Sequence, residues 1–510
     1  MTIRVDGEHL NIENVNNAAR LNTKLEIHPA ARERIIKCRE FVEKKIRDRA
    51  VMYGITTGIG ELSEVILTPD QLQDFQRYLI YSHAAGCGQP VSIEDVRAAM
   101  LSRINVLCKG HSAVRPVVVD TMVQMLNKGV TPVMCQKGSV GASGDLAPMA
   151  QMALVLMGEG EAFYKGDRLP GKTAMEKAGI PILTFEARDG LAVINGSNLT
   201  TGMGCLQIYD AERLTKTSEI AAAMTLEVLN ANMLAYDERL HKARGYEGSV
   251  LCAENIRRLT SGSELLAQRN KKVQDAYSLR STPQVVGPVK HTLEFARNMF
   301  LTELNGVGDN PLFFPEENNE GIVITGANFQ GTPLAFPLEF LGTAIATLTV
   351  LSERRTNRLM NPHLSAGLPA FLTKGAGMFS GMMLTQYTAG SLVCENRILS
   401  HPAATGSIPA AADQEDFVSM GMTTAIKTRQ ILENSNTVIA IELLAGAQAL
   451  DFRKPLKPGK GVQAAYNVIR KHIEFMIEDR PLYADINKLT EVVKSGEILE
   501  AVQSEIGALK

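Results

Sequence analysis

Helical periodicity is the feature that most constrains the fold of this chain. Apolar residues recur at three- and four-residue spacings in five long segments, residues 205–233, 287–304, 335–360, 423–450 and 462–478. Within residues 431–450, apolar side chains occupy nearly every face of the expected helix, which predicts a helix buried in a bundle. We therefore expect an all-α fold, with glycine-rich stretches such as residues 375–381 in loops.

The composition favours a large soluble protein. A chain of 510 residues normally divides into two or more lobes. A net charge of −2 with 45% hydrophobic residues argues against a nucleic-acid scaffold and against a protein bound to a membrane surface. The N-terminus lacks the pattern of a signal peptide, and the apolar run at residues 340–351 is shorter than a membrane span.

The number and spacing of cysteines and histidines indicate the cellular compartment and whether a metal site is present. The seven cysteines form no C-x-x-C pair, and their odd number argues for reduced thiols in a cytoplasm. The nine histidines are scattered and form neither an H-E-x-x-H motif nor a Cys/His cluster. We therefore expect a cytoplasmic protein without a metal site.

The tripeptide Ala142-Ser143-Gly144 can build an electrophile from its own backbone. Attack of the Gly144 amide nitrogen on the Ala142 carbonyl carbon, followed by loss of water from the ring and from the Ser143 side chain, leaves a methylidene-imidazolone (MIO) ring. Glycine suits the third position because its nitrogen can approach the carbonyl closely. The exposed alkene would be an electrophile, whereas reactive side chains are usually nucleophiles. It would take the role that a carbonyl cofactor has in other enzymes. Taken alone, however, this triplet is equally compatible with an ordinary loop.

The wider segment 138–150, GSVGASGDLAPMA, resembles the prosthetic-group segment of the aromatic amino acid ammonia-lyases and aminomutases. Seven further motifs follow in the order that this family shows: YGITTGIG at 53–60, SHAAG at 82–86, ING at 194–196, QDAYSLR at 274–280, GDNP at 308–311, GANF at 326–329 and QEDFVSMG at 414–421. The resemblance runs from about residue 50 to about residue 452.

The resemblance implies an architecture and an assembly. Members of this family have a smaller N-terminal lobe that carries the ring, and a long central helical bundle that tetramerises. We expect residues 1–200 to form the N-terminal lobe and residues 201–510 to form the bundle and the C-terminal helices. The expected partners are a small-molecule amino acid and three further copies of the chain, with each active site shared between subunits. The MIO ring would be the only cofactor.

The resemblance also assigns catalytic residues. Tyr53 matches the tyrosinate that removes the β-hydrogen of the substrate, and its pKa near 10 must fall for that role at neutral pH. Tyr277 is the second tyrosine of the pattern, and Asn195 is expected to hydrogen-bond the ring or the substrate amine. Without the resemblance, Tyr53 would be read as a structural anchor and Asn195 as part of an Asn-Gly turn.

Further residues are expected to bind the substrate. Arg280 follows Tyr277 by one helical turn if the segment is helical, and its guanidinium suits a bidentate grip on the substrate carboxylate. Gln284 and Asn310 match positions that support the ring, and Phe329 is expected to pack against the substrate.

Two positions bear on substrate choice. His83 could hydrogen-bond an imidazole or a phenol, and the Ser-His pair at 82–83 occurs both in histidine ammonia-lyases and in tyrosine aminomutases. Glu415 resembles the glutamate that contacts imidazole in histidine ammonia-lyases, where aryl-selective relatives carry Gln. A carboxylate is costly to leave facing a bare phenyl ring, so Glu415 favours L-histidine, with trans-urocanate as product.

Several departures keep other substrates open. Phe417 stands where histidine lyases carry His, Gln330 where most relatives carry His, and Thr56 where Asn is common. The alternatives are a tyrosine or phenylalanine ammonia-lyase, a 2,3-aminomutase, and a lyase for a modified histidine, for example one that eliminates trimethylamine from a betaine such as ergothioneine. A more remote alternative is a noncatalytic helical scaffold.

Overall fold

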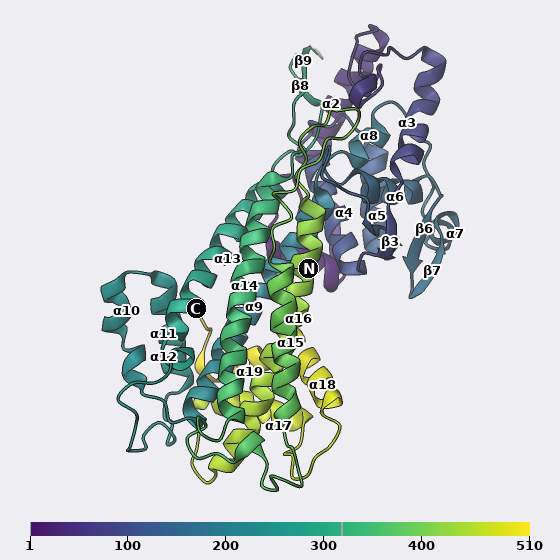
Figure 1. Cartoon of the computed structure of the whole chain (residues 1–510). Coiled ribbons are helices and arrows are strands. Elements are labelled where there is room, and N and C mark those ends of the chain that lie inside the picture. The colour runs from purple at the N-terminus through teal and green to yellow at the C-terminus, as the bar shows by residue number, and fades with distance from the viewer. Residues whose placement is uncertain (1, 318–319) are drawn as a thin grey trace. The chain divides into compact units, whose positions relative to one another are not determined.

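The computed structural model describes residues 2–317 and 320–510, and helices dominate it (Figure 1). This confirms the expected all-α class. The chain forms two compact units. Unit 1 comprises Met1–Tyr209, Ala296–Glu339 and Pro402–Ile426, and unit 2 comprises Asp210–Phe295, Phe340–His401 and Lys427–Lys510. Four long helices contribute residues to both units: α9 (Asn198–Val228), α13 (Thr282–Leu304), α14 (Thr332–Met360) and α16 (Gly421–Arg453).

Unit 1 combines short helices with small two- and three-stranded sheets. Its helices are α1 (Ile12–Arg20), α2 (Pro29–Arg47), η1 (Gly60–Leu62), α3 (Pro69–His83), α4 (Ile93–Cys108), α5 (Pro116–Lys128), α6 (Leu146–Leu156), α7 (Gly171–Lys177) and α8 (Asp189–Ile194). Strands β1 (Thr2–Val5) and β2 (Lys24–Ile27) pair in parallel. The antiparallel pairs are β3 (Cys87–Pro90) with β5 (Cys135–Lys137), β6 (Glu161–Tyr164) with both β4 (Thr131–Pro132) and β7 (Asp167–Pro170), and β8 (Leu312–Pro315) with β9 (Gly321–Ile324).

Helix α4 lies at the core of unit 1. Ser92 caps its first turn by accepting a hydrogen bond from the Asp95 amide at 3.2 Å, and every residue from 95 to 107 is more than 90% buried. The helix packs against α1 and α5. Because α4 is buried on all sides, its polar residues must find partners inside the protein.

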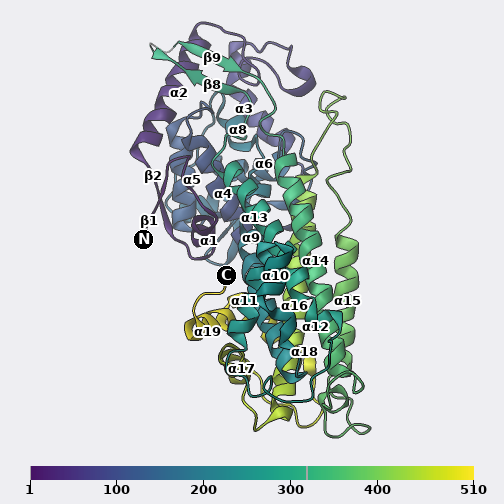
Figure 2. The ribbon, with the colours of Figure 1, turned by 90° about the vertical axis from the view of Figure 1, so that its left-hand side faces the viewer.

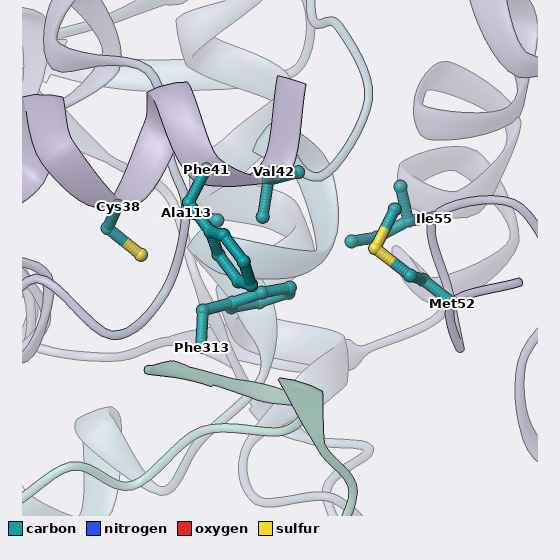
Figure 3. Close-up of a cluster of buried hydrophobic side chains, with 7 residues drawn as sticks. All are labelled: Cys38, Phe41, Val42, Met52, Ile55, Ala113 and Phe313. Atoms are coloured by element: carbon teal, nitrogen blue, oxygen red, sulfur yellow. The ribbon is translucent and has the colours of Figure 1, made fainter. Parts of the chain in front are cut away.

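A cluster of apolar side chains holds the segment that carries Tyr53. Figure 3 shows its seven members, which come from α2, from the turn at residues 52–55, from the segment before α5 and from β8: Cys38, Phe41, Val42, Met52, Ile55, Ala113 and Phe313. Met52 and Ile55 flank Tyr53 in the chain and are 4% and 1% exposed. Burial of each such side chain stabilises the fold by about 1.5–3 kcal/mol, so the backbone on both sides of Tyr53 is anchored.

Unit 2 is a helical bundle in which α15 (Met383–Leu399) runs beside the unit 2 residues of α14 and α16 in both views (Figures 1 and 2). Its remaining helices are η2 (Met233–Tyr236), α10 (Glu238–Arg244), α11 (Glu247–Leu259), α12 (Tyr277–Arg280), η4 (Ala370–Leu372), α17 (Lys460–His472), α18 (Leu482–Ser495) and α19 (Glu497–Ile506). Residues 438–450 of α16 are all buried, as its apolar faces predict. An ion pair between Arg355 and Glu442, 2.5 Å apart and at most 1% exposed, crosses the bundle interior.

Two helices end earlier than the periodicity predicts. The apolar pattern over 205–233 extends beyond the end of α9 at Val228, where Asn230 adopts a left-handed backbone (φ +51°). The pattern over 462–478 extends beyond the end of α17 at His472. Ile473 and Met476 remain 2% and 4% exposed although they lie outside the helix. Burial, and not helix formation, therefore accounts for the apolar residues at these ends.

Helix α14 contains the apolar run at residues 340–351 and extends it in both directions. Residues 340–351 belong to a 29-residue helix whose most apolar 18-residue window has a mean hydropathy of 1.7. By length and composition this helix could cross a membrane, whereas the run by itself is too short. Because 67% of that window is buried inside the protein, its side chains have the environment of a core helix.

Candidate active site

A cavity of about 440 Å³ in unit 1 gathers residues from six separate parts of the chain. It is lined by Tyr53, Ile59, Gly60, Glu61, Leu62, His83, Ser143, Leu146, Leu191, Asn195, Asn310, Ala411, Ala412 and Glu415. Six of the residues singled out in the sequence are therefore brought together: Tyr53, His83, Ser143, Asn195, Asn310 and Glu415. An apolar wall with a few convergent polar groups is the usual composition of a small-molecule site.

Residues 142–144, here called the precursor turn, occupy a tight bend between β5 and α6. Ser143 has a left-handed backbone (φ +52°), which is uncommon for a residue other than glycine. Gly144 (φ +83°) lies directly against Gly196, so that a Cβ on Gly144 would be 2.1 Å from the Gly196 carbonyl carbon. The contact leaves room only for glycine at 144, as the attacking nitrogen of the expected ring requires.

Asn195, at the end of α8, presents an unused hydrogen-bond acceptor. Its Nδ2 donates to the Asn310 carbonyl oxygen at 2.5 Å, while its Oδ1 is buried and has no partner among the described residues. A buried acceptor without a partner costs about 1–3 kcal/mol, so its retention at a cavity indicates a ligand that donates to it. The glycine contact fits an MIO ring formed beside Asn195. Because that ring carries no N–H, the free acceptor fits the N–H of a substrate amine.

A buried ion-pair network supports the backbones of Asn195 and Asn310. Asp309 accepts a hydrogen bond from Arg103 at 3.0 Å and forms an ion pair with Arg188 at 2.8 Å, and all three side chains are fully buried. Arg103 also donates to the Asn195 carbonyl oxygen at 2.8 Å, and Arg188 to that of Asn310 at 3.2 Å. The backbone carbonyl groups of Asn195 and Asn310 are thereby each held by a buried arginine.

Tyr53 faces the cavity with its phenol oxygen held by one amide. The Gly60 N–H donates to the Tyr53 Oη at 2.9 Å. Burial raises the pKa of Tyr53, the Gly60 hydrogen bond lowers it, the negative charge of Glu415 raises it and the positive charge of Arg188 lowers it. Because the net direction is upward, the phenol of this chain by itself is protonated at neutral pH.

His83 ends helix α3 as a neutral imidazole. Burial lowers the pKa of His83, although a hydrogen bond from its Nδ1 to the Leu79 carbonyl oxygen, at 2.8 Å, and the nearby Glu415 oppose this. With its proton on Nδ1, the neutral ring has its Nε2 as an acceptor. The imidazole can therefore accept a hydrogen bond from a substrate N–H or O–H.

Glu415 closes a short hairpin whose backbone pairs with Ala410 through two hydrogen bonds of 2.9 and 3.1 Å. Ala411, Ala412 and Asp413 all have left-handed backbones at its tip. The Ser143 hydroxyl donates to the Glu415 carboxylate at 3.3 Å. The hairpin thus directs a carboxylate toward the precursor turn and the cavity.

Asp145 is a functional candidate that the sequence did not single out. It follows the precursor turn directly, is 1% exposed, and accepts hydrogen bonds from Ser139 and from both the amide and the hydroxyl of Thr200. Burial raises the pKa of Asp145 to about 6, against these hydrogen bonds. The only sequence signal was its position beside the tripeptide, since nothing in the sequence reveals its burial.

Six predicted site residues do not line this cavity. Ala142 and Gly144 flank Ser143 in the precursor turn, and the other four lie elsewhere. Phe329 is half-buried in a turn of unit 1, where its carbonyl oxygen accepts from Ser197 at 3.0 Å. Tyr277, Arg280 and Gln284 belong to unit 2. Helix α12 confirms the one-turn spacing of Tyr277 and Arg280, and the guanidinium lies 4.5 Å from the centre of the tyrosine ring.

The helical fold and the cavity beside the precursor turn define an enzyme that acts on a small molecule. Residues 10–471 match the model of the aromatic amino acid lyase family. The chain belongs to this family of lyases.

Three relatives illustrate the similarity. The histidine ammonia-lyase of Caldanaerobacter subterraneus subsp. tengcongensis is 45% identical, over 98% of each chain. Among solved structures, the tyrosine aminomutase of Streptomyces globisporus has a TM-score of 0.95 at 36% identity, over 100% of each chain. The histidine ammonia-lyase of Trypanosoma cruzi has a TM-score of 0.92 at 34% identity, over 99% of this chain and 96% of that one.

Proposed function

We propose that this protein is an MIO-dependent ammonia-lyase that converts L-histidine to trans-urocanate and ammonia. The observation that carries the substrate assignment is the pair of Glu415 and His83 on the wall of one cavity that also contains Ser143. The similarity to the histidine ammonia-lyase of C. subterraneus over nearly the whole chain supports the same substrate.

The ring would form from Ala142, Ser143 and Gly144, and the fit of Gly144 against Gly196 supports its formation there. Once formed, the ring would supply an electrophilic alkene that activates the substrate amine as a leaving group. Asn195 holds an acceptor toward this position, because its Oδ1 is buried at the cavity without another partner among the described residues.

Tyr53 removes the β-proton of the substrate through its phenol oxygen. The Gly60 N–H stabilises the deprotonated form of that oxygen, since a hydrogen bond to an anion is stronger than one to the neutral phenol. Tyr277 is the second catalytic tyrosine. Arg280 grips the substrate carboxylate, while Gln284, Asn310 and Phe329 support the ring and the bound substrate.

Two hydrogen-bond acceptors, one charged and one neutral, would hold the doubly protonated imidazole of the substrate. Glu415 accepts a hydrogen bond from one ring N–H, which is favourable because a carboxylate left facing an apolar ring would be poorly solvated. His83, neutral and with its Nε2 as acceptor, can take a second hydrogen bond from a protonated ring nitrogen.

We further propose that the protein is a cytoplasmic homotetramer with active sites shared between subunits. Large side chains on the described surface support an assembly, because Tyr277 is 73% exposed and Val273 is 99% exposed in the single chain. Exposure of a residue proposed to be catalytic suits a position that another subunit covers.

The proposal is tested by incubating the purified protein with L-histidine, L-tyrosine and L-phenylalanine. Urocanate is followed by its near-ultraviolet absorption and ammonia is measured in parallel. Formation of both products from histidine alone would support the assignment. No turnover of histidine by a ring-containing protein would reject it.

A tyrosine 2,3-aminomutase is the second candidate, because the structure of the S. globisporus enzyme has a TM-score of 0.95 with this chain. The β-amino isomer of tyrosine, detected by chromatography in the same incubations, would identify it. Release of trimethylamine from a histidine betaine, with no reaction of histidine, would identify instead a lyase for a modified histidine.

A further inference from the structure

The precursor turn is held between two segments that are distant from it in the chain. On one side, the Gly196 amide donates to the Ser143 carbonyl oxygen at 3.1 Å. On the other side, the Met420 amide donates to the Val140 carbonyl oxygen at 2.9 Å. Backbone hydrogen bonds therefore fix the turn at Ser143 and at Val140, two residues before it begins.

The contact on the entry side is close-packed as well as hydrogen-bonded. Gly141 (φ +85°) lies so near Ser419 that a Cβ on Gly141 would be 2.2 Å from the Ser419 hydroxyl oxygen and 3.1 Å from the Met420 amide nitrogen. The same hydroxyl would be 2.8 Å from a Cβ on Gly331, which confines it from another side. Ser419 is 3% exposed, so its side chain has no solvent-filled space to move into.

Ring formation is sensitive to such contacts because it is an intramolecular attack. The Gly144 nitrogen must approach the Ala142 carbonyl carbon, and misplacement of reacting groups by about 1 Å can slow such a step by about 100-fold. The left-handed backbone of Ser143 costs roughly 1 kcal/mol in an isolated chain, so surrounding contacts must maintain it.

We propose that Ser419 and Met420 are positioning residues for formation of the ring, and that they hold the Gly141 side of the precursor turn while Gly196 holds the Gly144 side. This inference rests on the proposed function. The attack forms the bond between the Gly144 nitrogen and the Ala142 carbonyl carbon. The carbonyl oxygen leaves as water with the amide hydrogens of Ser143 and Gly144. The Ser143 hydroxyl then leaves as a second water with the hydrogen on its Cα, so no oxidant or further reactant is needed.

The Ser419–Met420 contact would also order ring formation after a step of folding. Residues 402–426 belong to unit 1 although the precursor turn precedes them by more than half of the chain. If the Ser419–Met420 contact is required, the ring forms only after this late segment has packed against the turn. Ring formation would then report completed folding of unit 1.

The test is a set of variants read by intact mass at a fixed time after synthesis, because the ring lowers the mass by two water molecules. Gly141→Ala introduces a methyl group against Ser419. We expect it to remain folded by circular dichroism and to form the ring about 100-fold more slowly. Gly141→Ala combined with Ser419→Gly removes the clashing hydroxyl and should restore much of the ring-containing fraction.

Gly166→Ala is the matched control, because Gly166 has a similar left-handed backbone (φ +90°) and no atom within 4 Å of its added Cβ. It should form the ring as the wild type does. Ser419→Val adds bulk from the opposite side of the same contact without placing alanine in a left-handed position, and it should also slow ring formation. This second variant decides the question if Gly141→Ala does not fold.

Turnover per ring-containing molecule and KM should stay near the wild-type values in all folded variants, since only the fraction of active protein changes. The positioning role would be overturned if Gly141→Ala formed the ring at the wild-type rate. If Gly141→Ala is unfolded, a wild-type rate in Ser419→Val would overturn it. An equal loss of ring formation in Gly166→Ala would also overturn it. Absence of the two-water mass loss in the wild type itself would instead reject the proposed function.

Discussion

One backbone contact of Tyr53 should set the pH at which this proposed base is active. Burial raises its pKa, and the Gly60 hydrogen bond is the largest influence that lowers it. The proposed base is the deprotonated phenol, so activity should rise with pH as Tyr53 loses its proton. A change in this contact should therefore move the pH profile and leave the fold intact.

Gly60→Ala tests this contact. Gly60 has a left-handed backbone (φ +56°), so alanine strains the turn and weakens the hold of its amide on the Tyr53 oxygen. The pKa of Tyr53 then increases, and the rising limb of kcat/KM should shift to higher pH. Gly166→Ala carries the same kind of strain in the turn between β6 and β7, which contributes no residue to the cavity, and should leave the profile unchanged. An unshifted profile in Gly60→Ala would show that the amide does not control this proton.

Glu415→Gln tests recognition of the substrate imidazole. The substitution keeps the size of the side chain but removes the negative charge that accepts the ring N–H. We expect kcat/KM for L-histidine to fall by about 100-fold or more, since a charge-assisted hydrogen bond is lost from a desolvated site. Glu61→Gln is the control, because Glu61 lines the same cavity but is exposed. An unchanged rate in Glu415→Gln would remove Glu415 from the substrate site.

At the scale of elements, the Arg103–Asp309–Arg188 network joins α4, α8 and the segment before β8. Asp309→Ala would leave two buried guanidinium groups without their carboxylate. We expect a loss of about 3–5 kcal/mol in the free energy of unfolding, measured by chemical denaturation. Glu161→Ala removes an exposed ion pair with Arg168 and should cost less than about 1 kcal/mol. Equal losses in the two variants would mean that the buried network has no special role.

At the scale of the whole molecule, Ser143→Ala tests whether the proposed tetramer assembles without the proposed ring. The alanine cannot lose a hydroxyl as water, so we expect no ring and at least a thousandfold lower turnover. Among the described residues, the hydroxyl hydrogen-bonds to Glu415, on the cavity wall, so the fold and the tetramer should persist in light scattering. Dissociation of the variant into monomers would link assembly to ring formation, and wild-type turnover would refute the ring mechanism.

The sequence by itself determined the helical class, the buried character of residues 438–450 and the tripeptide that can form a ring. These features are local, because periodicity is read within one element and the ring needs only three consecutive residues. The one-turn spacing of Tyr277 and Arg280 followed from local geometry for the same reason.

Only the tertiary structure decided how the remaining groups behave. The meeting of His83, Asn195 and Glu415 at one cavity, the unpartnered Oδ1 of Asn195 and the pKa of about 6 for Asp145 depend on residues far apart in the chain. Desolvation and close packing set these properties, and both arise from neighbours that no local pattern identifies. Close packing also restricts residue 141 to glycine, because a Cβ there would collide with Ser419. Ser419 approaches Gly141 only in the folded chain.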